Sequence, residues 1–260
     1  MSAVKRRTEQ VQSPVYDPGA YPPFAVTVDI VVLTIDADGN LAVVLIQRDE
    51  PPFQYAWALP GGFVRPDETL DAAAARELNE ESGIDAAAHL EQFGAYGEPD
   101  RDPRMRVVSI GYLAVLRDVA GLRAGSDAAE AQLIAVADVL TTKQYQLAFD
   151  HHRILTDAIE RLRTKLELTP LAAAFIGPTF TLTDLRRVYE STWQTRLDPG
   201  NFRRKVLATQ GFVESTGAIA PPGPEGGKPA EIYRVGQPVD DRLAAPMWQP
   251  RNRNEPVKDE

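Results

Sequence analysis

Three glutamates in one short segment have the spacing of a metal-binding helix face. Glu77, Glu80 and Glu81 follow one another at i, i+3 and i+4 within residues 69–82, a stretch rich in Ala, Leu and Glu. In a helix this spacing places all three carboxylates on one face, where they repel one another unless a cation lies between them. Carboxylates, waters and substrate phosphate oxygens form the octahedral environment that Mg²⁺ prefers. Such a helix face has the chemistry of a Mg²⁺ or Mn²⁺ site that acts on phosphorylated substrates.

Residues beside these glutamates can complete such a site. Arg76 can orient a carboxylate through the paired donors of its guanidinium. Gly61 and Gly62 lack Cβ atoms, so their backbone can approach a metal or a phosphate closely. Gly83 follows the helical stretch, as the glycine that ends many helices does. Taken alone, three glutamates are more often a solvated acidic helix face, and only the wider spacing favours the metal site.

The spacing across residues 61–84 resembles the complete Nudix box. Its fixed positions are filled by Gly62, Glu68, Arg76, Glu77, Leu78, Glu80, Glu81, Gly83 and Ile84. The resemblance implies an α/β/α sandwich over a mixed sheet, which cleaves a nucleoside diphosphate linked to another group. It also implies that the glutamates at 77, 80 and 81 hold the catalytic metal and that Glu68 and Arg76 orient them. The box does not specify the substrate.

The composition excludes several other kinds of site. The 260 residues contain no cysteine, which excludes disulfides, iron–sulfur clusters and a thiol nucleophile. The histidines are His89, His151 and His152, and since two of them are adjacent, no histidine-rich metal site is expected. The net charge of −9 excludes a polycation that coats nucleic acid, but it allows a local basic patch.

The two ends of the chain differ from the middle. Residues 1–24 combine prolines with polar groups and have no apolar stretch typical of a signal peptide, so we expect a flexible leader. Residues 237–260 interleave prolines with charges, which predicts a disordered tail. No apolar run is long enough to span a membrane. We therefore expect a cytoplasmic protein without a membrane partner.

Strand and helix patterns place the box inside a larger domain. Strands are predicted within 25–48, 57–64 and 105–116, a helix within 147–165, and a polar loop at 119–130. Pro170 disfavours helical backbone at the residue before it. We therefore predict that a Nudix domain at 25–167 is followed by a separate domain at 168–236.

Residues 186–205 reverse the sign of the acidic chain, with six basic side chains against two acidic ones. Thr181 and Asp184 have the spacing of a capping box, and Asp198-Pro199 predicts the start of a second helix. Strands are predicted at 211–213 and 231–235, joined by a loop rich in Pro and Gly. Two helices and a hairpin with a basic tip predict a small winged helix-turn-helix domain that binds double-stranded DNA. The candidate DNA-binding residues are Arg186, Arg187, Asn201, Arg203, Arg204, Lys205 and Lys228. The alternative is a solvated arginine face on a helical appendage.

This pair of domains resembles the Nudix-related transcriptional regulators of NAD metabolism (NrtR). The segments that carry the resemblance are AWALPGGFV (56–64), RDPRMRVVSIGY (101–112), LAFDHHRIL (147–155), NFRRKVL (201–207) and GKPAEIYRV (227–235). It implies a homodimeric repressor of genes for NAD biosynthesis or salvage, which ADP-ribose releases from operator DNA when it binds the Nudix domain. In this interpretation Arg48, Arg101 and Arg104 contact ligand phosphates beside Gly61 and Gly62. For these arginines, surface salt bridges are the alternative.

The intact acidic positions leave a second function open. Regulators that resemble this chain often carry a degraded box, as expected where binding without turnover is selected. Here every carboxylate is present, which permits Mg²⁺-dependent hydrolysis of ADP-ribose to AMP and ribose 5-phosphate. The alternatives are a repressor, a pyrophosphatase whose second domain serves assembly, and a protein with both activities.

Overall fold

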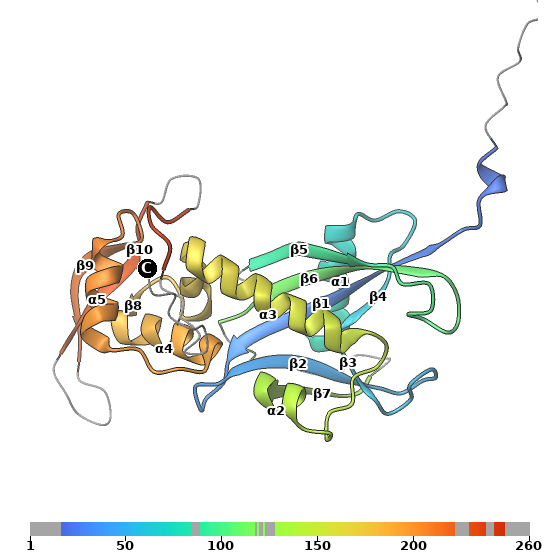
Figure 1. The fold of residues 1–260 in the computed structure, drawn as a ribbon, viewed down its shortest axis with the longest axis horizontal. Helices are drawn as coiled ribbons and strands as arrows, with labels where there is room; N and C mark the ends of the chain where they lie inside the picture. The colour runs from blue at the N-terminus through green and yellow to red at the C-terminus, as the bar shows by residue number, and fades with distance from the viewer. Residues whose placement is uncertain are drawn as a thin grey trace, which may run out of the picture.

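The computed structural model describes residues 17–84, 89–117, 119, 122, 128–221, 229–237 and 242–247. Figure 1 shows two lobes joined end to end, the larger built from residues up to α3 (His151–Leu168) and the smaller from those after it. Ahead of the larger lobe, the short helix η1 (Pro18–Ala20) lies on an arm that extends away from the body. No helix in these ranges combines the length and apolarity needed to cross a membrane.

The described residues of the larger lobe form a mixed sheet of seven strands. Its strands are β1 (Ala25–Ile35), β2 (Leu41–Arg48), β3 (Trp57–Ala58), β4 (Gly61–Phe63), β5 (His89–Tyr96), β6 (Val107–Val115) and β7 (Ala128–Ala135). β1 lies at the centre, parallel to β6 and antiparallel to β2 and β4. The register of β1 with β4 sets Asp29 opposite Gly61, which places the start of the Nudix box beside the central strand.

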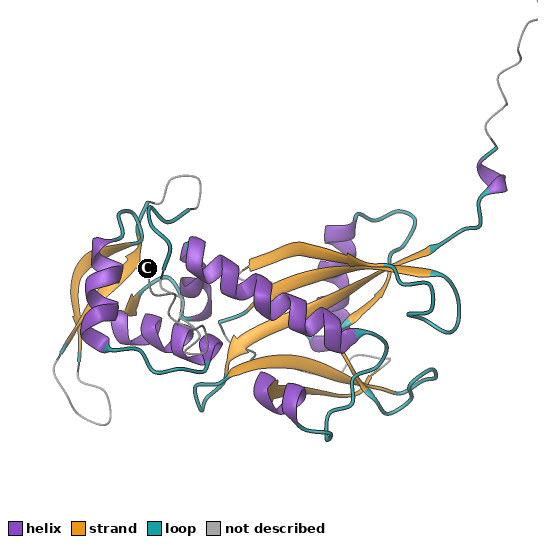
Figure 2. Ribbon diagram, viewed as in Figure 1, coloured by secondary structure: helices purple, strands orange, loops and turns teal. Residues whose placement is uncertain are grey.

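Helices cover both faces of this sheet (Figure 2), as the predicted α/β/α sandwich requires. α1 (Leu70–Ser82) packs on one face against Val28 and Val32, and α3 packs on the other against Val31 and Leu33. Successive strand residues point to opposite faces, so a strand covered on both sides is apolar throughout. α2 (Val136–Thr141) follows β7.

The ends of α1 follow their sequence signals. The side chain of Thr69 accepts a hydrogen bond from the backbone N–H of Ala72, which satisfies one of the free donors of the first turn. Gly83 ends the helix with a φ of 71°, a left-handed conformation that glycine adopts at little cost. Ala74 and Leu78 are buried against the sheet, and Glu77 and Glu81 of the same helix face β4, where they lie against Gly62 and Gly61.

The smaller lobe has the architecture of a winged helix. It contains η2 (Pro170–Phe175), β8 (Phe180–Thr181), α4 (Leu182–Trp193), α5 (Pro199–Ala208), β9 (Val213–Ala220) and β10 (Ala230–Val235). The predicted capping box is present in full at the start of α4, and the Asp198 side chain caps α5 as expected. β10 pairs antiparallel with both β8 and β9.

Three elements of the larger lobe were not predicted: β5, β7 and α2. β7 begins at Ala128, inside the predicted loop at 119–130, and pairs with β2 over most of its length. Its sequence, AAEAQLIA, is poor in residues that favour strands, so pairing with an existing strand determines its conformation.

Part of the predicted disordered tail is docked onto α3. The backbone N–H groups of Leu243 and Met247 donate to the carbonyls of Leu168 (2.9 Å) and Glu167 (2.7 Å), and Met247 is 3% exposed. The last carbonyls of a helix have no partner within the helix. Here the returning chain supplies the N–H donors for two of these carbonyls. The prediction differs at 242–247 because a sequence pattern does not reveal this docking site.

Candidate functional site

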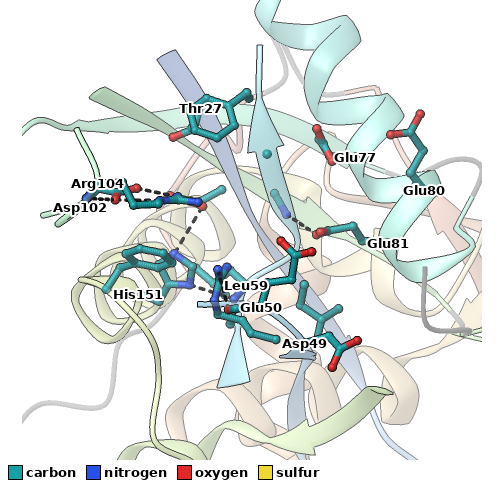
Figure 3. A pocket seen from close by; sticks show the side chains of 18 of the residues that line it. Thr27, Asp49, Glu50, Leu59, Glu77, Glu80, Glu81, Asp102, Arg104 and His151 are labelled. Carbon is teal, nitrogen blue, oxygen red and sulfur yellow. Dashed lines mark hydrogen bonds and ion pairs between the residues drawn. The ribbon is translucent and has the colours of Figure 1, made fainter. Parts of the chain in front are cut away.

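A cleft of about 490 Å³ opens in the larger lobe, between α1, β4, the loop after β2 and the start of α3. Figure 3 shows Glu77, Glu80 and Glu81 on one side of it, with Arg104 and His151 across from them. The two sides differ in charge, because the Nudix-box glutamates lie on one side and arginines with aromatic rings on the other.

Arg76 joins three of the predicted site carboxylates. Its guanidinium donates twice to Glu68 (2.6 and 2.9 Å), and one of its nitrogens, Nη1, donates to both Glu77 Oε1 (2.6 Å) and Glu80 Oε2 (2.9 Å). Hydrogen bonding to Arg76 lowers the pKa of Glu68 to about 2. Burial raises the pKa of Glu77 by more than the opposing effect of Arg76 lowers it.

Each of the two glycines at the start of the box is required for a different steric reason. A Cβ on Gly61 would lie 2.2 Å from the carbonyl oxygen of Val28, so only glycine lets this strand approach β1. A Cβ on Gly62 would lie 2.3 Å from Glu77 Oε1, so glycine admits that carboxylate. The N–H of Gly61 donates to Glu81 Oε2 at 2.6 Å, which fixes the third glutamate at the cleft.

The glutamate side chains have the ligand atoms that a divalent cation prefers, but their arrangement in the structure is not that of a metal site. Glu77, Glu80 and Glu81 offer the hard oxygen ligands that Mg²⁺ and Mn²⁺ prefer. Arg76, however, already bridges Glu77 and Glu80, and among the residues that the structure describes no three acidic or histidine side chains converge as a metal-binding group. A bound divalent ion would neutralise a diphosphate and lower the pKa of an attacking water.

Two arginines flank one aromatic ring on the opposite side of the cleft. The guanidinium carbons of Arg48 and Arg104 lie 5.0 and 5.8 Å from the centre of the Phe149 ring. Arg48 is held by the carbonyls of Pro52 and Glu50. Burial lowers the pKa of Arg48, and repulsion from Arg104 lowers it further. Two neighbouring guanidinium groups beside a ring suit the phosphates and the planar base of a nucleotide.

Arg101 does not join this pair, although the sequence predicted a phosphate contact for it. Its guanidinium donates to Asp29 Oδ2 (3.1 Å) and, through two nitrogens, to the carboxylate of Asp150 (2.6 and 3.1 Å). Its side chain is only 4% exposed. Arg101 also borders the cleft, but its Nε and Nη2 groups donate to carboxylates of the protein, and its contact with a ligand phosphate stays a prediction.

Asp29 is the centre of the buried cluster around Arg101. It also accepts a hydrogen bond from Ser109 Oγ and lies 3.4 Å from His151 Nε2. The N–H of Leu59 donates to His151 Nδ1 at 3.0 Å, so the imidazole proton belongs on the nitrogen that faces Asp29. Burial alone would raise the pKa of Asp29, but His151, Arg101 and Ser109 outweigh it and lower the pKa to about 2.

Sequence reasoning missed Asp29, Phe149 and the role of His151. One signal for Asp29 was available, since it is the single charge within the apolar strand AVTVDIVVLTI, and a buried charge requires partners. Nothing comparable marked Phe149, whose place beside two arginines depends on the folding of separate segments.

The predicted DNA-binding residues fall into different environments. Arg203 and Arg204 are exposed on α5, where Arg204 donates to Asn201 Oδ1 (2.6 Å) and Arg203 lies 3.7 Å from Glu231 of β10. Lys205, next to them, is half-buried. Asn201, Arg204 and Lys205 border one basic surface of α5, and Arg203 lies on another side of the helix, against β10.

The two predicted arginines of α4 lie apart from that surface. Arg186 donates to Glu190 and to the Leu197 carbonyl, contacts that stabilise the turn between α4 and α5. Arg187 lies near Gly39 of the larger lobe, beside Ser191, whose hydroxyl donates to the Gly39 carbonyl. Lys228 lies outside the described residues.

Comparison with known proteins gives the same two-part division. Residues 23–158 match the NUDIX domain model, and residues 172–235 match the model of the NrtR DNA-binding winged helix domain. The chain is 34% identical over 253 residues, 95% of its length and 97% of the relative's, to the "ADPR responsive transcriptional repressor NtrR" of Acinetobacter baylyi. Over 117 residues, 44% of this chain and 64% of the relative, it is 41% identical to the ADP-ribose pyrophosphatase of Methanocaldococcus jannaschii.

A solved structure shares the whole arrangement. The crystal structure of Shewanella oneidensis NrtR with a 27mer DNA is matched over 86% of this chain and 99% of that one, with 30% identity and a TM-score of 0.70. Fold and site thus define a Nudix domain joined to a DNA-binding winged helix. The chain belongs to the NrtR family of Nudix-related transcriptional regulators.

Proposed function

We propose that this chain is an ADP-ribose-responsive transcriptional repressor. It binds operator DNA through α5 and the hairpin of β9 and β10, and ADP-ribose in the cleft of the larger lobe weakens that binding. The observation that carries the proposal is the exposure of two arginines, Arg203 and Arg204, on α5, the second helix of the winged-helix domain. A helix placed in this way reads the major groove.

The cleft has the features that a nucleotide ligand requires. Arg48 and Arg104 supply positive charge for a diphosphate, and the ring of Phe149 supplies a surface for a planar base. The relative from A. baylyi is named as ADPR-responsive, which supports ADP-ribose as the ligand. Its release in NAD turnover makes it a chemical signal for regulating NAD biosynthesis or salvage genes.

We further propose that the protein binds DNA as a homodimer. Helix-turn-helix proteins read two half-sites about one helical turn, roughly 34 Å, apart. Two copies are then needed for two recognition helices, and a ligand that changes their separation by a few ångströms weakens the complex.

The test is fluorescence anisotropy at one fixed salt concentration. Duplexes from promoters of NAD-synthesis genes are compared with a scrambled duplex of the same length and base composition. We expect tighter binding to a promoter duplex, and loss of this preference in Arg203→Ala with ADP-ribose binding unchanged. Equal, salt-sensitive binding to both duplexes would mean that α5 binds DNA only through nonspecific electrostatic attraction. That result would refute the proposal that the protein is a repressor.

A metal-dependent pyrophosphatase activity in the same cleft is the second candidate. It is favoured by the complete acidic box and by the 41% identity to an ADP-ribose pyrophosphatase over the Nudix part. If it operates, AMP and ribose 5-phosphate accumulate from ADP-ribose when Mg²⁺ or Mn²⁺ is present, and Glu81→Gln abolishes the reaction. If the native protein hydrolyses ADP-ribose only at the background rate with both metals, the pyrophosphatase proposal is refuted and the repressor proposal still stands.

A further inference from the structure

Two arginines of one short loop have opposite surroundings. The segment Arg101–Arg104, here called the RDPR loop, links β5 to β6 beside the cleft. Arg104 is 42% exposed and lies 5.6 Å from the Phe63 ring and 5.8 Å from the Phe149 ring. Arg101 also borders the cleft but is only 4% exposed, and its guanidinium donates to Asp29 and Asp150. One side chain of the loop is thus available to a ligand, and the other holds the protein's own carboxylates.

Among the residues that the structure describes, Arg104 pairs with one carboxylate, and that partner lies within the same loop. Its guanidinium donates to both carboxylate oxygens of Asp102 (3.0 and 2.7 Å). A phosphate beside Phe149 would compete with Asp102 for these donors, because guanidinium forks bind phosphates and carboxylates with similar geometry. Ligand binding therefore alters the contacts of the RDPR loop.

Arg101 attaches the same loop to the first turn of α3. Asp150 is the N-cap residue of α3, yet its carboxylate makes no capping hydrogen bond. The carboxylate of Asp150 instead accepts two hydrogen bonds from Arg101, at 2.6 and 3.1 Å. The next residue, His151, is fixed by Leu59 and Asp29. The start of α3 is therefore held by cleft residues in place of its own cap.

The other end of α3 contacts the smaller lobe. At 1.5 Å per residue, a helix of 18 residues is about 27 Å long. Near its end, Tyr189 of α4 donates from its hydroxyl to the carbonyl of Leu166 at 2.9 Å, and Arg163 donates to the carbonyl of Thr192. Leu162 and Leu166 share one buried cluster with residues of α4. The end of α3 is thus attached to α4, the helix that precedes α5.

Resting on the proposed function, we propose that Arg101 is the positioning residue that couples ADP-ribose in the cleft to the winged helix. In the free protein Arg104 is paired with Asp102. In the bound protein Arg104 turns to the ligand, the RDPR loop shifts, and Arg101 carries the shift through Asp150 into α3. The coupling then depends on the two hydrogen bonds between Arg101 and Asp150, and DNA contacts are altered without any ligand contact in the smaller lobe.

The experiment measures a coupling ratio, the Kd for a promoter duplex with saturating ADP-ribose divided by the Kd without it. The variants are Arg101→Lys, which keeps the charge and loses the fork, and Asp150→Asn, which keeps the size and loses the charge. Arg153→Ala is the matched control, because Arg153 links α3 to Glu98 ahead of the RDPR loop at 3.3 Å on the exposed surface. ADP-ribose affinity is measured separately by calorimetry.

We expect a ratio of about ten or more in the native protein and in Arg153→Ala. In Arg101→Lys and Asp150→Asn the ratio should fall to within about twofold of one, while affinity for DNA alone and for ADP-ribose alone changes by less than about threefold. A merely structural role would lower both affinities together, and that result would overturn the inference. A native ratio retained in both variants would also overturn it, with the proposed function intact. A native ratio of one would refute the proposed function itself.

Discussion

Asp29→Asn removes one negative charge from the buried cluster beneath the cleft and keeps the size of the side chain. In the native protein this carboxylate faces Arg101, Ser109 and His151. The substitution leaves these groups without the charge that they surround. We expect a less stable protein at neutral pH, because a buried cation that loses its partner is costly.

The magnitude follows from the pKa of Asp29, which is lowered from 3.8 to about 2 in the folded protein. At about 1.4 kcal/mol per pKa unit, the charged form contributes about 2 kcal/mol to the free energy of unfolding. Since the folded pKa is the lower one, this stabilisation is complete above about pH 5. It is lost as the pH falls through about 4 towards 2, and about half of it remains near pH 3.

The assay is urea unfolding of the native protein and the variant near pH 7 and near pH 3. We expect Asp29→Asn to be less stable by about 2 kcal/mol near pH 7 and by about half as much near pH 3. Asp38→Asn, in the exposed turn between β1 and β2, is the control, with an effect below about 0.5 kcal/mol. A loss below about 0.5 kcal/mol near pH 7, or one that does not change with pH, would show that the charge of Asp29 does not stabilise the fold.

Three further substitutions test other parts of the account. Gly62→Ala places a Cβ 2.3 Å from Glu77 Oε1, so the carboxylate must move, and ADP-ribose affinity measured by calorimetry should fall by about tenfold or more. Arg204→Ala on α5 should weaken DNA binding and reduce the slope of log affinity against log salt by about 1, because one phosphate contact is lost. Tyr189→Phe removes the hydroxyl bonded to Leu166 and should lower the free energy of unfolding in urea by about 1 kcal/mol.

Each of these predictions has a matched control. A Cβ on Gly97 would lie 3.6 Å from Val108, so Gly97→Ala should leave ADP-ribose affinity unchanged, and an equal loss in both glycine variants would contradict the steric argument. Arg161→Ala, on α3, should leave the salt slope unchanged, and an unchanged slope in Arg204→Ala would count against a phosphate contact. The hydroxyl of Tyr145 is outside the core, so Tyr145→Phe should have the same free energy of unfolding as the native protein. A Tyr189→Phe protein as stable as this control would disprove the contribution of the α4 hydroxyl.

Local signals predicted those parts of the molecule that local chemistry determines. The capping box of Thr181 and Asp184, the N-cap at Asp198 and the helix end at Gly83 each depend on residues within a few positions. The box glutamates could be placed on one helix face because helix periodicity alone decides this. The resemblance to the NrtR family then assigned one regulatory function to the pair of domains.

Contacts between distant segments account for what the sequence did not reveal. Arg101 and Asp29 are 72 residues apart in the chain, and Arg101 and Asp150 are 49 apart. An arginine next to a predicted cleft is equally consistent with a ligand contact and with a buried ion pair until the fold is known. β7 has the same origin, since its partner β2 is more than 80 residues away and its own sequence favours no strand. The docked segment 242–247 depends likewise on the position of the end of α3.

The central claim is that ADP-ribose in the cleft weakens DNA binding by the winged helix. It is tested most directly by titrating ADP-ribose, without added metal, into a preformed complex with a fluorescent promoter duplex while anisotropy is recorded. We expect a fall to the value of free DNA in the native protein, and a shift of the midpoint to about tenfold higher ADP-ribose in Gly62→Ala. Anisotropy that stays at the value of the complex, at ADP-ribose concentrations that calorimetry shows to be saturating, would contradict it.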